Sequence, residues 1–121
     1  MNWTGLLIFV AVVVAFMLLR RVGQISVQKA RNLISKGAVV VDVRSTGEFA
    51  SGHLPWAINI PLDDIEEVLP GRFPDRMLPI LLHCQSGMRS GIARSKLRGI
   101  GYTNAFNLGS FSRAAQIVRR R

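Results

Sequence analysis

The feature that most constrains the fold is an apolar segment that runs directly into the only cysteine of the chain. Residues 78–83 read Leu-Pro-Ile-Leu-Leu-His, Cys84 follows, and a short loop leads through Gly87 and Arg89 to Ser90, where a helical pattern begins. A strand, a tight loop and a helix N-terminus in this order direct backbone N–H groups at one point, which favours anion binding. The sequence therefore predicts an anion site with a thiol in its floor.

Strand and helix patterns alternate on both sides of this segment. Apolar runs at 38–43, 57–60, 77–83 and 105–108 predict strands, and amphipathic or capped stretches at 27–36, 46–50, 62–69, 90–98 and 111–118 predict helices. Ser26 is expected to cap the first helix and Thr46 the second. Continuous apolar strands are typical of sheets covered on both faces, which are mainly parallel. The predicted fold class is therefore α/β.

The N-terminal segment is apolar and uncharged. All 16 Lys and Arg and all 7 Asp and Glu residues lie beyond residue 19. A secretory signal is disfavoured, because no basic residue precedes the apolar run and no small-x-small cleavage site follows it. At ~1.5 Å per residue the uncharged stretch reaches roughly 28 Å, enough for the hydrocarbon core of a bilayer. Residues 1–21 are therefore expected to form a transmembrane anchor helix that contacts lipid through residues 3–19.

The residues that flank this segment predict its orientation. Trp3 suits one membrane interface, and Arg20 and Arg21 suit the other. Lys29 and Lys36 follow within about twenty residues, whereas no basic residue precedes the segment. The positive-inside rule then predicts a single-pass protein of the inner or cell membrane, with its N-terminus outside and the domain at 22–121 in the cytoplasm. About a hundred residues suffice for one such domain.

The net charge and the residue composition indicate which partners and cofactors to expect. The net charge of +9 favours an anionic partner. Nucleic acid is disfavoured, because the basic residues are scattered without aromatic interleaving or a recognisable motif. The single cysteine excludes an internal disulfide, and no Cys or His spacing suits a metal. Neither a metal nor an organic cofactor is expected.

Several short motifs occur in a fixed order along the chain. They are Asp42-Val-Arg44, Glu48-Phe49, Gly52-His-Leu-Pro55, the stretches 57–61 and 101–109, and Cys84-Gln-Ser-Gly-Met-Arg89-Ser90. Together they resemble a rhodanese homology domain, and the resemblance covers residues 25–111. It implies a mainly parallel sheet of about five strands covered by helices on both faces. One departure is Gly109-Ser110-Phe111, where the family often has Gly-Gly and then a tryptophan.

The resemblance implies a sulfurtransferase that uses Cys84 as its catalytic nucleophile. The thiolate takes the outer sulfur of a small anionic donor such as thiosulfate, becomes a persulfide, and passes the sulfur to a thiol or cyanide acceptor. The position of Cys84 also favours a reactive thiol over a structural one, because helix N-termini and arginines lower a cysteine pKa. The loop residues expected to bind the donor are Gln85, Ser86, Gly87, Met88 and Arg89.

Four residues are expected to support the site structurally: Asp42, Arg44, His53 and Ser90. Asp42 and Arg44 share one face at the end of a strand, and Arg44 is expected to pair with Asp42 or Glu48. His53 is expected to shape the Gly-His turn and Ser90 to cap the following helix. His83 is expected to take no part, because neighbouring strand residues point to opposite faces.

Two alternatives to sulfur transfer stay open. The first is a non-catalytic, membrane-bound binding or adaptor module that keeps the fold, although such a module need not retain Cys84. The second, less favoured, is a rhodanese-fold phosphatase. Such enzymes resemble this chain but use Cys-x5-Arg, whereas four residues separate Cys84 from Arg89 here. The shorter loop suits a sulfur atom better than a phosphate.

Overall fold

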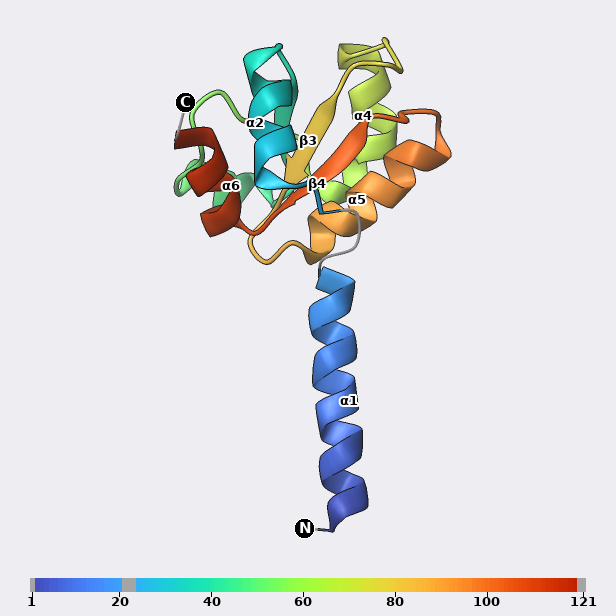
Figure 1. Cartoon of the computed structure of the whole chain (residues 1–121). Helices are drawn as coiled ribbons and strands as arrows, with labels where there is room; N and C mark the ends of the chain where they lie inside the picture. The colour runs from blue at the N-terminus through green and yellow to red at the C-terminus, as the bar shows by residue number, and fades with distance from the viewer. Residues whose placement is uncertain (1, 21–23, 120–121) are drawn as a thin grey trace.

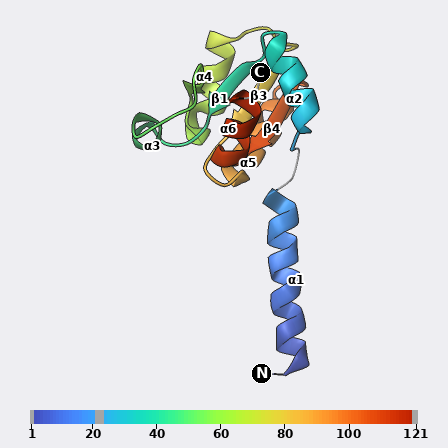
Figure 2. The same ribbon diagram turned by 60° about the vertical axis from the view of Figure 1, so that its left-hand side comes forward.

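The computed structural model describes residues 2–20 and 24–119. Helix α1 (Trp3–Arg20) extends away from an α/β domain (Figures 1 and 2). The elements of the domain are, in chain order, α2 (Val27–Ser35), β1 (Val39–Asp42), α3 (Thr46–Ala50), β2 (Ile58–Asn59), the 3-10 helix η1 (Leu62–Asp64), α4 (Ile65–Arg72), β3 (Ile80–His83), α5 (Met88–Gly99), β4 (Ala105–Gly109) and α6 (Phe111–Arg119).

The strands form one parallel sheet in the order β2-β1-β3-β4. Helices α2 and α6 cover one face, and α4 and α5 cover the other (Figure 1). Side chains alternate accordingly: Val41 and Leu82 pack in the cluster with α4 and α5, and Val40 and Leu81 pack in the cluster with α2 and α6. The predicted α/β class, with a parallel sheet covered on both faces, is confirmed.

The expected strand count of about five is wrong, because the described residues form four strands. Among the described residues before α2, Gln24 forms a single bridge with Asn107 of β4, and Ile25 N donates to Asn107 O at 2.9 Å. Ser26 follows at once, and its Oγ accepts a hydrogen bond from Lys29 N, as predicted for the cap of α2. The helix therefore begins before a fifth strand can extend.

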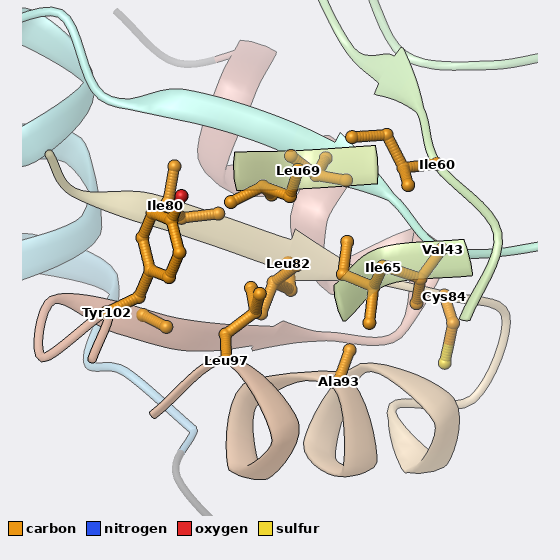
Figure 3. Packing of buried hydrophobic residues seen from close by; sticks show 12 residues of the cluster. Val43, Ile60, Ile65, Leu69, Ile80, Leu82, Cys84, Ala93, Leu97 and Tyr102 are labelled. Atoms are coloured by element: carbon orange, nitrogen blue, oxygen red, sulfur yellow. The ribbon is translucent and has the colours of Figure 1, made fainter. Parts of the chain in front are cut away.

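The cluster beneath α4 and α5 positions the start of α5. Ala93 and Leu97 of α5 and Ile65 of α4 point at the sheet, and Cys84 lies at one end of the same cluster (Figure 3). All four side chains are fully buried. Burial of each large apolar side chain contributes about 1.5–3 kcal/mol, so this packing holds α5 firmly beside the end of β3.

Helix α5 begins two residues earlier than expected. Its N-cap is Gly87, which adopts a left-handed conformation at φ +95°. Side chains disfavour this conformation by ~1–2 kcal/mol, whereas glycine accepts it. Ser90, expected to cap the helix, is instead a buried residue inside its first turn.

Helices α3 and α4 also differ from expectation. Ser45, not Thr46, caps α3: Ser45 Oγ accepts from Glu48 N at 3.2 Å, and Glu48 Oε1 accepts from Ser45 N at 3.1 Å. This reciprocal pair is a capping box. A 3-10 turn precedes α4, which continues through Pro70 to Arg72.

The prediction of a transmembrane helix is not supported. Within residues 2–20 and 24–119, no helix is long and apolar enough to cross a membrane. Met1, Arg21 and the side chain of Arg20, which were assigned to the anchor or its interface, lie outside the described residues.

Candidate active site

The candidate site lies where β3 ends and the loop to α5 begins, at the carboxyl edge of the sheet. Open parallel sheets place their binding sites at this edge. The loop is tied to the turn between β4 and α6 by two backbone hydrogen bonds, from Cys84 N to Gly109 O at 3.3 Å and from Phe111 N to Gln85 O at 3.2 Å. The position of Cys84 is thus fixed by three neighbouring elements.

Two hydrogen-bond donors point at the Cys84 sulfur. Gly87 N lies 3.0 Å and Ser90 Oγ 3.5 Å from Sγ. Burial raises the pKa of this thiol, but hydrogen bonds from Ser90, through its hydroxyl and its backbone, and from the backbone of Gly87 and Ser86 outweigh that effect. The pKa of Cys84 therefore lies below its usual value. A thiolate is the nucleophilic form of cysteine, so the loop favours a reactive sulfur.

The loop residues expected to bind a donor contribute unequally. The backbone of Ser86 and Gly87 faces the sulfur, whereas the side chains of Gln85, Ser86 and Met88 are exposed. The structure thus supports a cradle formed by the backbone. In residues 2–20 and 24–119, no three His, Cys, Asp or Glu side chains are grouped as a metal site requires.

Arg89 binds a carboxylate of the protein. Its Nη1 and Nη2 donate to Glu48 Oε1 and Oε2 at 2.7 and 3.0 Å. The hydrogen bond from Arg89, followed by that from the Ser45 backbone, lowers the pKa of Glu48 to about 2. The same pairing raises the pKa of Arg89. A charged ion pair of α3 and α5 therefore borders the loop, which the sequence motifs did not reveal.

Asp42 and Arg44 form the expected pair. Arg44 Nε lies 3.0 Å from each carboxylate oxygen of Asp42, and Arg44 Nη2 donates to Oδ2 at 2.7 Å. Arg44 Nη2 also donates to Gly52 O at 2.8 Å, and the guanidinium lies 4.7 Å from the ring centroid of Phe111. Both charged residues are buried. The pair joins the end of β1 to the Gly52 turn and to α6, which is a structural role.

His53 lies in that same turn. Its ring stacks on Phe49 at a centroid distance of 3.8 Å, and its Nδ1 lies 3.0 Å from Phe49 O. The residue is exposed. These contacts hold the turn against α3, and none of them reaches Cys84.

His83 is fully buried on the face of the sheet opposite to the Cys84 sulfur. Its ring packs edge-on against Phe111 of α6, whereas Cys84 packs in the cluster with α5. His83 Nε2 lies 3.8 Å from Asp42 Oδ2, and Nδ1 lies 3.4 Å from the Cys84 carbonyl oxygen. Burial lowers the pKa of His83, with the Asp42 carboxylate acting in the opposite direction.

Asn107 is a site residue that the sequence motifs did not reveal. This fully buried residue of β4 accepts hydrogen bonds at Oδ1 from Ser90 Oγ (2.7 Å) and Gly109 N (2.8 Å), and its Nδ2 donates to Gly87 O (3.1 Å). One amide thus positions Gly87 and Ser90, the two residues beside Sγ. Because the Ser90 hydroxyl has a single hydrogen, it donates either to Asn107 Oδ1 or to Sγ, whereas the Gly87 N–H faces Sγ in both cases. The sequence contained one sign of this role: Asn107 lies inside an apolar strand, and Asn is uncommon in strands.

The fold and the site define a class of protein: a parallel α/β domain with an activated cysteine between a central strand and a helix N-terminus. A profile described as Rhodanese-like domain matches residues 26–115. The chain therefore belongs to the rhodanese family.

Three similar proteins indicate what this family includes. The chain is 35% identical over 69 residues to thiosulfate sulfurtransferase PspE of Escherichia coli. The aligned residues make up 57% of this chain and 66% of PspE. It is also 32% identical over 85 residues to thiosulfate sulfurtransferase GlpE of Ectopseudomonas mendocina. These residues make up 70% of this chain and 76% of GlpE. The structure of human single domain sulfurtransferase TSTD1 superposes with a TM-score of 0.66 at 29% identity, covering 82% of this chain and 97% of TSTD1.

Proposed function

We propose that this protein moves a sulfane sulfur from a donor such as thiosulfate to a thiol, or to cyanide, through a persulfide on Cys84. The observation that carries this function is that Gly87 N–H donates to the buried Sγ at 3.0 Å and that the Ser90 hydroxyl lies 3.5 Å from it. The similarity to two proteins named thiosulfate sulfurtransferase supports the same reaction.

In the first step the Cys84 thiolate attacks the outer sulfur of the donor. A new bond forms from Sγ to that sulfur, the bond between the two sulfur atoms of thiosulfate breaks, and sulfite leaves with the electron pair. Cys84 then carries a persulfide whose terminal sulfur holds the negative charge. The backbone N–H groups of the loop stabilise that charge, because they are directed at it before the reaction begins.

In the second step the acceptor removes the sulfur. The acceptor thiolate attacks the terminal sulfur of the persulfide, and the electron pair of the breaking bond returns to Sγ of Cys84. The acceptor leaves as a persulfide, or as thiocyanate when cyanide is the acceptor. The thiolate is restored beneath the same hydrogen-bond donors, ready for another donor.

The burial of Cys84 sets a condition for both steps. Its exposed fraction is 0%. A donor therefore reaches Sγ only after the groups that cover it move aside.

Mass spectrometry of the folded protein tests the proposal. Incubation with thiosulfate should add the mass of one sulfur atom to the peptide that contains Cys84, and a thiol should remove it. Turnover of thiosulfate and cyanide should be lost in Cys84→Ser. An unmodified Cys84 and equal rates for wild type and Cys84→Ser would instead support a binding module.

We further propose that the domain works at the cell membrane, on its cytoplasmic side. The apolar side chains of α1 are exposed over its length, for example Leu7, Phe9 and Leu18. An apolar surface of this extent favours contact with lipid. Fractionation of cells should find the full chain with membranes and a variant lacking residues 1–20 in the soluble fraction. Protease added to intact cells should leave the domain uncut, and the reverse results would contradict this location.

A further inference from the structure

Glu48 carries a negative charge at the edge of the active-site loop under all ordinary conditions. Its carboxylate is fixed from two sides, by the Ser45 backbone N–H of the capping box and by the two terminal nitrogens of Arg89. Its pKa of about 2 leaves it ionised across the range in which the protein is folded and active. The side chains of Glu48 and Arg89 are 36% and 37% exposed, so a dissolved anion meets both charges together.

Arg89 lies in the chain between Gly87 and Ser90, whose N and Oγ atoms are 3.0 and 3.5 Å from Sγ. The hydrogen bond that Arg89 donates to Glu48 is the main cause that raises the pKa of Arg89, and the negative charge of Cys84 acts in the same direction. Without Glu48, the guanidinium would offer a full positive charge to an anion that approaches the sulfur. With Glu48 bound to both terminal nitrogens, most of that attraction is cancelled.

Two other arginines near this edge are also engaged. Arg44 is paired with the Asp42 carboxylate and Gly52 O, and Arg113 donates to the carbonyl oxygens of Leu108 and Ile25. A donor at the loop therefore meets mainly backbone N–H groups and the N-terminus of α5. Such groups carry only partial charges, so with Arg89 paired to Glu48 the site offers no full positive charge to match the second negative charge of a dianion.

We propose that Glu48 is a specificity-determining residue that, by neutralising Arg89, makes the site favour sulfur donors with one negative charge or none over the thiosulfate dianion. The class of donor favoured comprises thiol persulfides and thiosulfonates. This inference rests on the proposed sulfur transfer. Loading from a thiosulfonate is balanced in the same way: the Cys84 thiolate takes the outer sulfur, and a sulfinate leaves with the electron pair.

Glu48→Gln isolates the charge of the residue. Glutamine keeps an oxygen that accepts from Ser45 N, so the capping box is preserved. The probes are thiosulfate and methanethiosulfonate, which present the same outer sulfur but differ by one negative charge. At low ionic strength, Glu48→Gln should lower KM for thiosulfate about fivefold and change KM for methanethiosulfonate less than about twofold.

Glu66→Gln is the matched control. Glu66 also pairs with a cation of α5, Lys96, at 3.9 Å, about two helical turns beyond Arg89. The control removes the same charge and should leave the ratio of the two KM values unchanged. In an Arg89→Gln background, Glu48→Gln should no longer change the ratio, because its effect passes through Arg89.

Equal changes in KM for both donors, or none, would overturn the proposal, as would a full effect of Glu48→Gln in the Arg89→Gln background. Thermal unfolding of each variant establishes that it is folded. Failure of the wild type to use either donor would instead contradict sulfur transfer itself, so the two outcomes are distinguishable.

Discussion

The two donors on the Cys84 sulfur are held in place by different means. Gly87 presents its N–H because it adopts φ +95°, and Ser90 presents its hydroxyl from inside the first turn of α5. Asn107 binds both, through Gly87 O and Ser90 Oγ. The reactivity of the thiol therefore depends on three residues from the loop, α5 and β4.

Replacement of Ser90 by alanine should raise the pKa of Cys84. The hydroxyl is the first of the hydrogen bonds that lower this pKa, and a hydrogen bond to a charged group is worth about 1.5 kcal/mol or more. Near neutral pH the rate of alkylation by iodoacetamide should fall about tenfold, with its pH midpoint moved upward. Ser95→Ala, which removes a hydroxyl bound to Gly91 O on the same helix, is the control. Identical pH profiles for Ser90→Ala and wild type would contradict the role of the hydroxyl.

Replacement of Gly87 by alanine should impair sulfur transfer more than folding. The left-handed conformation costs a side chain ~1–2 kcal/mol, and relief of that strain would move the N–H away from Sγ. We expect turnover to fall by about tenfold or more and the protein to stay folded. Gly99→Ala, at the other end of α5 and with open space at its Cβ, should keep full turnover. Wild-type turnover in Gly87→Ala would argue against the cradle.

At the scale of elements, α3 positions the loop from the side. The capping box of Ser45 and Glu48 fixes the first turn of this short helix, and the same Glu48 carboxylate binds Arg89 of α5. A five-residue helix is not stable alone, so its geometry depends on these contacts. Helix α3 therefore links the turn that follows β1 to the start of α5.

Ser45→Ala should lower the free energy of unfolding by about 1 kcal/mol, the usual cost of losing a side-chain N-cap. Chemical denaturation measures this change. Thr46→Ala removes the hydroxyl that the sequence favoured as the cap and should leave stability nearly unchanged. Equal losses in the two variants would show that the cap is not specific to Ser45.

Much of the fold could be predicted from local patterns. The four apolar runs contain β1, β2 and β3 and all of β4 except Gly109, because strands buried on both faces need mostly apolar residues. The Cys84 loop was also recognisable, since a strand, a glycine and a helix follow one another in sequence. Local patterns did not reveal the cap at Gly87, because a glycine in a loop has many allowed conformations.

The contacts between distant segments were the part that could not be predicted. Glu48 and Arg89 are 41 positions apart, and Asn107 and Ser90 are 17 apart. Each pairing exists only because the sheet brings α3, β4 and α5 to one edge. We expected Arg89 to bind the donor directly, because the sequence shows that Arg89 lies in the loop but does not show that it pairs with Glu48.

At the scale of the molecule, the sheet buries charged and titratable groups just below the site. Asp42, Arg44 and His83 are all buried at the carboxyl edge. Asp42 and Arg44 neutralise one another, whereas His83 Nε2 has no hydrogen-bond partner among the described residues. His83 is therefore the group whose protonation most directly opposes the folded state.

Stability should fall in mildly acidic solution because of His83. Its pKa is lowered in the folded protein relative to the ordinary value of 6.5, so the unfolded chain binds more protons between these two values. The stabilisation is complete above 6.5 and is lost as the pH falls from 6.5 toward the folded-state pKa. Denaturant titrations at several pH values should show that the free energy of unfolding decreases as the pH falls through this range. His83→Asn should remove this pH dependence, and the control variant His53→Asn, at an exposed position, should keep it. A wild-type stability independent of pH in this range would contradict the assignment.

The complete burial of Cys84 also fixes an order of events in time. Because opening precedes capture, the rate of loading rises with donor concentration only until it equals the rate at which the loop exposes the sulfur. Beyond that point, small donors with very different leaving groups share one maximum rate. The maximum rate of this protein is then set by the motion that exposes Sγ rather than by the sulfur chemistry.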